Sequence, residues 1–194
     1  MTERDAFILS EHALAGVIDQ IHPDQWEKRK PEWFHTSGQG DASLREIVNY
    51  HAYDSAWVPD VLAGRTIADV GDRHEHLKTA AQPRYREQSE AAVAAAQALD
   101  DPERVVHLSY GDFPAREYLR HVTSFRGFRA FDIARWIGAS TELPPDLVQG
   151  MWDELSPDME AWRAMGVYKA AVPVDDDAPL QDRLIGLSGR DPRG

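Results

Sequence analysis

The chain has 194 residues, of which 42% are hydrophobic and 28% charged, as expected for a globular protein with a substantial core. Its net charge of −12 would repel a phosphate backbone, so we expect no nucleic acid partner. The lack of cysteine excludes disulfides, thiolate metal ligands and a cysteine nucleophile, and it agrees with a reducing, cytoplasmic location. The apolar patch in residues 1–16 is too short and too interrupted by charge for a signal peptide or a membrane span.

Apolar residues recur with helical spacing near the start of the chain and predict a first helix from about Glu3 to Ile21. Pro23 closes this helix. The polar stretch that follows contains prolines, glycines and two tryptophans, which is typical of a loop. We expect Trp26 and Trp33 to pin this loop to the core.

A second helix is expected to begin at Ser43, because Ser43 and Glu46 have the spacing of a capping box, and to end at Gly64. The alanine-rich segment from about Pro83 to Leu99 predicts a third helix. Between this segment and the next helix, VVHLSYGD (residues 105–112) is the one convincing extended piece.

A fourth helix is expected from Pro114 to Gly138, and a fifth helical region from Pro145 to Met165 that breaks at Ser156-Pro157. The C-terminal tail should hold a short helix over Leu180–Leu187. Several long helices with so little strand predict an all-α fold, an up-and-down four-helix bundle with a short extended segment and a C-terminal tail. No internal repeat or linker divides the chain, so residues 1–194 are expected to form a single domain.

The fourth helix carries an apolar stripe into which Arg129 falls, together with Phe125 and Ile133. A guanidinium in an apolar interior is costly unless it is paired and hydrogen-bonded. Asp132, three residues on, could pair with it locally, and Asp54 on the second helix could pair across the bundle. Either Arg129 closes a buried salt bridge, or it faces a cavity and receives an anionic group, because its planar fork matches a carboxylate or phosphate.

His121 lies two turns before Arg129 on the same stripe, and Tyr50 and His51 lie one turn before Asp54 on the second helix. A cluster of Tyr50 or His51 with Asp54, His121 and Arg129 in the interior is therefore reasonable. Such a cluster can move protons, since a nearby cation favours an ionised tyrosine and a carboxylate can hold the proton of an imidazole.

Six stretches of the sequence, taken in order, resemble the metal-binding bundle of the mycothiol-dependent maleylpyruvate isomerase family, part of the wider DinB-like superfamily. They are SLREIVNYHAYDSAWVPDVLAG (43–64), IADVGDR (67–73), VHLSYGDFPAREYL (106–119), RAFDIARWIG (129–138), ELPPDLV (142–148) and GRDP (189–192). The resemblance spans most of the chain and implies a DinB-like four-helix bundle with a metal ion in its core, which serves thiol-dependent isomerisation or transfer.

The resemblance also implies three metal ligands, a histidine on the second helix and an acid and a histidine four residues apart on the fourth. Here Tyr50, Phe125 and Arg129 stand at these positions. Phenylalanine cannot coordinate a metal and arginine repels a divalent cation, so the usual metal site is not expected. A shifted set of His51, Asp54 and His121 is the alternative for a metal, because His51 and Asp54 are three residues apart on one helix.

The leading hypothesis is a metal-free, divergent member whose core pocket accepts a small anionic organic molecule. Arg129 would anchor the molecule, while Tyr50, Asp54 and His121 exchange protons with it in an isomerisation or thiol-transfer reaction. The alternatives are a metal-dependent mycothiol transferase or isomerase with the shifted ligands, and a non-catalytic binding or scaffold protein. The residues require no cofactor, but mycothiol or a divalent metal is compatible with them; the expected assembly is a monomer or homodimer.

Overall fold

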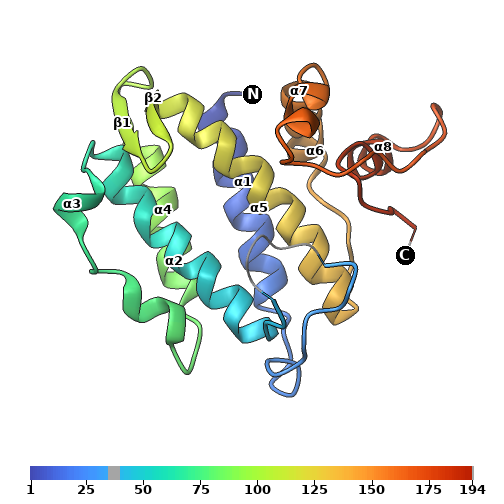
Figure 1. Cartoon of the computed structure of the whole chain (residues 1–194), viewed down its shortest axis with the longest axis horizontal. Coiled ribbons are helices and arrows are strands. Elements are labelled where there is room, and N and C mark those ends of the chain that lie inside the picture. Colours follow the sequence, from blue (N-terminus) through green and yellow to red (C-terminus); the bar gives the residue numbers. More distant parts are fainter. Residues whose placement is uncertain (35–39, 194) are drawn as a thin grey trace.

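The computed structural model describes residues 1–34 and 40–193, and it is mainly helical (Figure 1). Its elements in chain order are α1 (Glu3–Ile18), α2 (Leu44–Leu62), α3 (Ile67–Val70), the 3-10 helix η1 (Glu75–Thr79), α4 (Tyr85–Gln97), β1 (Val105–Leu108), β2 (Gly111–Pro114), α5 (Ala115–Ile137), α6 (Pro145–Leu155), α7 (Met159–Ala164) and α8 (Leu180–Leu187). In the described part of the chain, no helix has the length and apolar character needed to cross a membrane.

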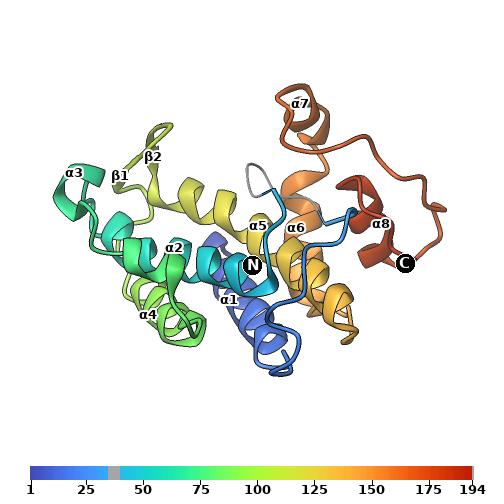
Figure 2. The same cartoon turned by 60° about the horizontal axis from the view of Figure 1, so that its bottom comes forward.

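The four longest helices pack against one another in a chain of pairs, α5 on α1, α1 on α4 and α4 on α2 (Figure 1). The direct backbone contact between α2 and α5 is slight, and side chains bridge that gap instead. The shorter helices α6, α7 and α8 lie beyond α5, on the side away from α2 (Figures 1 and 2).

The sequence signals at the helix ends account for several boundaries. Ser43 caps α2 and forms with Glu46 the expected capping box, since each side chain bonds the backbone amide of the other. Gly138 ends α5 in the left-handed conformation, with φ of 77°, which glycine adopts without steric cost. The predicted helix over Leu180–Leu187 is confirmed, as is the break between α6 and α7 at Ser156-Pro157.

Two sequence predictions need correction. The first helix ends at Ile18 rather than near Ile21, and residues 19–20 form a turn. The predicted extended piece, residues 105–112, is not one strand but β1, a turn formed by Ser109 and Tyr110, and the first two residues of β2, with Leu108 paired to Gly111 in an antiparallel hairpin. The second strand ends at Pro114, and α5 begins at the next residue, Ala115, so no loop separates the hairpin from the helix.

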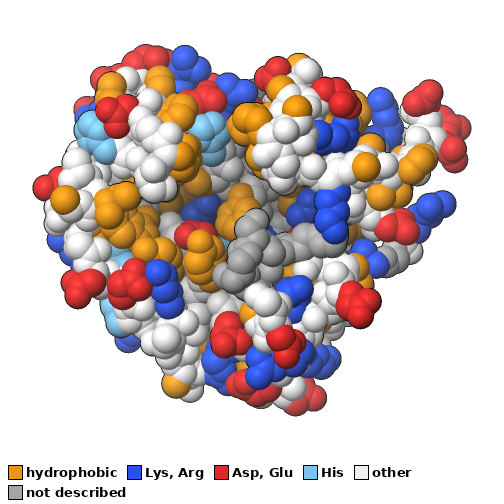
Figure 3. All heavy atoms as spheres, viewed as in Figure 1, with side chains coloured by type: hydrophobic (Ala, Val, Ile, Leu, Met, Phe, Trp, Pro, Cys, Tyr) orange, Lys and Arg blue, Asp and Glu red, His pale blue; other side chains and the backbone are white. Residues whose placement is uncertain are grey.

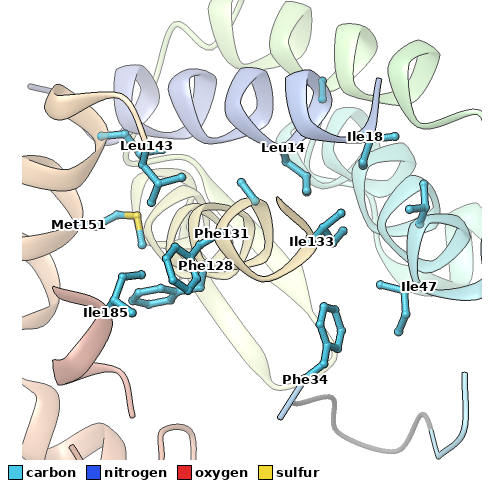
Figure 4. Close-up of a cluster of buried hydrophobic side chains, with 14 of the residues drawn as sticks. Leu14, Ile18, Phe34, Ile47, Phe128, Phe131, Ile133, Leu143, Met151 and Ile185 are labelled. Atoms are coloured by element: carbon cyan, nitrogen blue, oxygen red, sulfur yellow. The ribbon is translucent and has the colours of Figure 1, made fainter. Parts of the chain in front are cut away.

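The main hydrophobic core joins α1, α2, α5, α6 and α8. Its side chains include Leu14, Ile47, Phe128, Phe131, Ile133, Met151 and Ile185, all at most 2% exposed (Figure 4). Phe34, in the loop before α2, is fully buried in the same cluster. Trp26 and Trp33 are partly buried against this core, as expected for the residues that hold the loop in place.

Gly186 makes the close packing of α8 possible. A Cβ atom there would lie 2.8 Å from the backbone oxygen of Val172, which bonds through its own amide to the Gly186 carbonyl. We expect Gly186→Ala to lower the free energy of unfolding by about 1–3 kcal/mol, because backbone has to shift to relieve the contact. Gly16→Ala is the matched control. A Cβ atom at Gly16, within α1, meets no atom within 4 Å, so this change should stabilise the helix by up to about 1 kcal/mol in denaturant unfolding. Equal effects of the two changes would contradict this account of α8.

Candidate functional site

A cleft of about 800 Å³ runs along one face of α5. Its walls come from the loop before α2, the turn of the β1–β2 hairpin, the segment that follows α7 and the segment that follows α8. Figure 3 shows the hollow between the lobe that carries the hairpin and the lobe that carries α7, with hydrophobic side chains on its walls. The face of α5 that lines the cleft carries His121, Phe125, Phe128 and Arg129. Residues three or four positions apart lie on one side of a helix, so the sequence spacing brings these side chains to the same face.

Arg129 lies at one end of this cleft and is 4% exposed. Its Nη1 is 3.5 Å from Asp132 Oδ2, so the local ion pair predicted from the sequence is confirmed. Asp132 is shared, because Arg190 bonds both of its carboxylate oxygens, at 2.9 and 3.0 Å. The Arg129 guanidinium also lies 4.4 Å from the centre of the Phe34 ring, within the range of a cation–π interaction.

Burial lowers the pKa of Arg129 to about 10, with Asp132 opposing the change and Arg190 adding to it. The guanidinium is therefore still charged at neutral pH, and it shares the Asp132 carboxylate with Arg190. The cleft lining has four basic side chains, Lys30, Arg129, Lys169 and Arg190, and one carboxylate, Glu32. Asp132, outside the lining, is the partner that Arg129 and Arg190 share. This excess of positive charge is notable in a chain whose net charge is −12. An anion in the cleft would offset the cost of burying Arg129.

His121 lies at the other end of the cleft, in a group of aromatic rings that includes Phe113 and Trp162. Its Nε2 is 3.2 Å from Glu117 Oε1, and its Nδ1 is 3.2 Å from the Tyr110 hydroxyl. Tyr110 lines the same cleft and is 60% exposed. His121 thus has a carboxylate on one ring nitrogen and a phenol on the other, an arrangement suited to proton transfer.

The other two predicted site residues do not join this cleft. Tyr50 is 40% exposed and lies in a separate, shallow depression with Glu46 and Lys78. On α2 it is His51, not Tyr50, that faces the interior of the protein. His51 is 3% exposed, and the centre of its ring lies 5.0 Å from the centre of the Phe125 ring. The predicted cluster is therefore divided, with His121 and Arg129 in the cleft and Tyr50 outside it.

Asp54 lies on the inner side of α2 and lines neither hollow. No other described side chain forms an ion pair or hydrogen bond with its carboxylate, so the predicted cross-bundle pair with Arg129 is absent from the described structure. Burial raises the pKa of Asp54 to about 6, against the influence of Arg126 and Lys78. The Asp54 charge in turn is the largest cause of a raised pKa at Tyr50, followed by burial. Tyr50 is therefore held as a neutral phenol, not as the phenolate considered from the sequence.

The sequence prediction missed a second buried arginine. Arg126 is 2% exposed and forms an ion pair with Glu11, which is fully buried on α1. The Tyr85 hydroxyl donates to Glu11 Oε2 at 2.6 Å, and the Ser55 hydroxyl donates to Glu11 Oε1 at 3.0 Å. Arg126 Nη2 donates to Ser55 at 3.2 Å. One polar network thus joins the four long helices.

A signal for this network was present in the sequence. Glu11 stands in the helical stripe of Phe7, Leu14 and Ile18, so the pattern places a carboxylate in the core just as it places Arg129 there.

The positions that the family resemblance assigns to metal ligands do not fit a divalent ion. Phe125 lines the cleft with its ring, Arg129 brings a positive charge, and Tyr50 points elsewhere. Burial, and then the charges of Arg129 and Arg126, lower the pKa of His51 well below its usual value and keep it neutral. Within residues 1–34 and 40–193, no three His, Cys, Asp or Glu side chains are placed to hold a metal, so His51, Asp54 and His121 do not form the alternative ligand set.

The cleft can therefore bind an anion at the Arg129 end and exchange protons at the His121 end, along a floor of aromatic and aliphatic side chains.

Neither a protein-family model, nor a curated protein, nor a solved structure matches the chain.

Proposed function

We propose that the cleft along α5 binds a small organic anion, with Arg129 as its anchor. The observation that carries this proposal is the gathering of four basic side chains in the walls of one cleft of an acidic protein, with Glu32 in the lining and Asp132 behind it as the nearby carboxylates. A carboxylate is the favoured group, because the planar guanidinium can donate two parallel bonds to it. The rings of Phe125 and Phe128 would cover the apolar part of the same molecule.

We further propose that the chain is a divergent DinB-like protein, in which α1, α2, α4 and α5 are the four helices of the bundle. The six ordered stretches that resemble the maleylpyruvate isomerase family support this assignment. At the position where the resemblance expects a metal-binding histidine, Arg129 supplies a fixed positive charge to the cleft. An organic anion would then meet arginine where relatives present a metal ion.

The chemistry that these residues can add to binding is proton transfer. His121 has Glu117 and Tyr110 on its two nitrogens and shares the cleft with Arg129. An isomerase- or transferase-type enzyme that moves a proton on a carboxylic acid would use both ends of such a site. We propose this class of reaction, with Arg129 fixing the acid and His121 acting as the acid–base group through the Tyr110 hydroxyl, which contacts its Nδ1.

Arg129→Met tests the proposal. Wild-type protein should bind small carboxylic acids roughly ten- to a hundredfold more tightly than the corresponding amides, as expected for a charge-assisted bond. The preference should vanish in Arg129→Met. Calorimetry of a set of acids, each measured beside its amide, gives the result directly. Arg135→Met is the matched control, since it removes the same charge from the same helix at a residue that does not line the cleft.

The same variant separates binding from structural support. Asp132 keeps both of its bonds to Arg190 when Arg129 is replaced. The loss of stability should therefore be well below the 3–5 kcal/mol that is typical when a buried charge is left alone. Equal binding of acids and amides by the wild-type protein would overturn the proposed function. A large loss of stability in Arg129→Met, without any acid preference in the wild type, would assign Arg129 to the scaffold.

A further inference from the structure

The end of the cleft opposite Arg129 holds a fixed chain of three polar side chains, Glu117, His121 and Tyr110. Glu117 Oε1 is 3.2 Å from His121 Nε2, and the other oxygen of Glu117 accepts a bond from Arg120 Nη1 at 2.8 Å. The Glu117 carboxylate is thus held by two partners. An ionised carboxylate only accepts hydrogen bonds, so Glu117 favours the neutral His121 tautomer that carries its proton on Nε2. In this tautomer Nδ1 accepts from the Tyr110 hydroxyl.

This chain gives Tyr110 a defined direction. Its hydroxyl hydrogen is directed to His121, which leaves the lone pairs of the phenol oxygen free to accept a bond from the cleft. Burial and the Glu117 charge both raise the pKa of Tyr110, so the phenol stays protonated. The rings of Phe113 and His121 pack beside the Tyr110 ring, at 5.5 and 5.8 Å between centres, and hold it at the mouth of the cleft.

The two polar ends of the cleft are well separated. His121 and Arg129 are eight residues apart on one helix, which corresponds to about 12 Å between their backbone positions. Between them α5 contributes the apolar side chains of Val122, Phe125 and Phe128 and one hydroxyl, that of Ser124. A ligand that reaches both ends therefore has an apolar body with a polar group at each end.

We propose that the cleft selects a carboxylic acid that carries a hydroxyl group at the far end of an apolar or aromatic body, and that Tyr110 binds this hydroxyl. Tyr110 touches the ligand, while His121 and Glu117 are positioning residues that set the direction of the Tyr110 hydroxyl. This inference rests on the proposed function, because the carboxylate of the same molecule is held at Arg129.

The experiment uses a series of 4-hydroxyphenyl alkanoic acids with increasing numbers of methylene groups, each paired with the analogue that lacks the hydroxyl. Calorimetry on the full chain measures the gain in affinity that the hydroxyl gives at each length. We expect roughly a two- to tenfold gain, the range for one hydrogen bond, only for the members long enough to span the cleft. Tyr110→Phe should abolish this gain. Because Tyr110 is 60% exposed, the variant should fold normally.

Glu117→Gln tests the positioning role, and Tyr50→Phe is the control. Glu117→Gln should weaken binding of the hydroxylated acid and leave its analogue unchanged, whereas a merely structural role would weaken both members of a pair equally. Tyr50→Phe removes a tyrosine hydroxyl outside the cleft, so the gain should persist. If Tyr110→Phe keeps the gain, or if no length shows one while acids still bind better than amides, this inference is wrong and the proposed function stands. If acids show no preference over amides, the proposed function itself fails.

Discussion

Replacement of Glu11 by alanine is expected to lower the free energy of unfolding by about 3–5 kcal/mol, the typical cost of removing one partner of a buried ion pair. Glu11 is fully buried, and its carboxylate is the common acceptor for Arg126, Ser55 and Tyr85. Without it, the Arg126 guanidinium is left charged in an interior from which it cannot reach water. Much of the expected loss is the cost of that uncompensated charge.

Urea unfolding at neutral pH, compared with wild type, measures this effect. Glu103→Ala is the control, because it also removes the acidic partner of an arginine, Arg116, but at the surface. Its expected effect is at most about 1 kcal/mol. The double variant Glu11→Leu/Arg126→Met removes both charges and should recover part of the loss, since well-packed apolar groups can replace a buried ion pair. If Glu11→Ala and Glu103→Ala cost the same, the network does not hold the helices together.

The positions of the long helices could be predicted from the sequence because their signals are local. Apolar spacing, the capping box at Ser43 and the glycine at 138 are each read within a few residues. The short helix α3 was missed, although Thr66 and Asp69 form a capping box of the same kind. It has four residues, too few for an apolar stripe to be recognised.

The site was predicted less well because its contacts are long-range. Glu11 and Arg126 are 115 residues apart, and no periodicity within one helix can pair them. The burial of Arg129 and its ion pair with Asp132, three residues away, could be predicted from spacing within one helix. The hydrogen bond that Arg190 in the C-terminal tail donates to Asp132 could not be predicted in this way, because it joins two distant parts of the chain. Tyr50 was misplaced because helical rotation was judged from the resemblance rather than from the apolar pattern of α2, which places His51 inside.

The buried network and the cleft use neighbouring turns of α5. Arg126 points toward Glu11 on α1, and Arg129, one turn later, lines the cleft. The ion pair at Arg126 therefore fixes the rotation of the helix on which Arg129 and His121 are displayed. On this basis, loss of the Glu11–Arg126 pair should weaken acid binding as well as stability, whereas loss of Arg129 should weaken binding far more than stability.

Asp54→Asn is expected to stabilise the protein at neutral and alkaline pH and to have little effect below about pH 4. Burial raises the pKa of the Asp54 carboxyl from 3.8 to about 6. Between these values the folded protein holds a proton that the unfolded chain has released, so the free energy of unfolding falls as the pH rises. Above about pH 6 the full penalty is present, because a partly buried carboxylate that lacks a hydrogen-bonding partner among the described side chains carries its charge.

The size of the effect follows from the change in pKa. At about 1.4 kcal/mol for each pKa unit, the increase from 3.8 to about 6 corresponds to roughly 3 kcal/mol at most, and relaxation or water near the carboxylate would reduce it. Asparagine has nearly the same shape but no charge to bury. The stability of Asp54→Asn relative to wild type should therefore rise from near zero at pH 3.5 to a plateau above pH 7.

Urea unfolding at several pH values measures this difference, and Glu46→Gln provides a control of opposite sign. Bonds from the Ser43 backbone and hydroxyl lower the pKa of the Glu46 carboxyl. The charged form of Glu46 therefore stabilises α2 above its unfolded pKa, and this contribution is lost as the pH falls. Glu46→Gln should be most destabilising at neutral pH, where Asp54→Asn is most stabilising. A difference between Asp54→Asn and wild type that stays constant from pH 3.5 to pH 8 would show that Asp54 does not titrate as an isolated, buried acid.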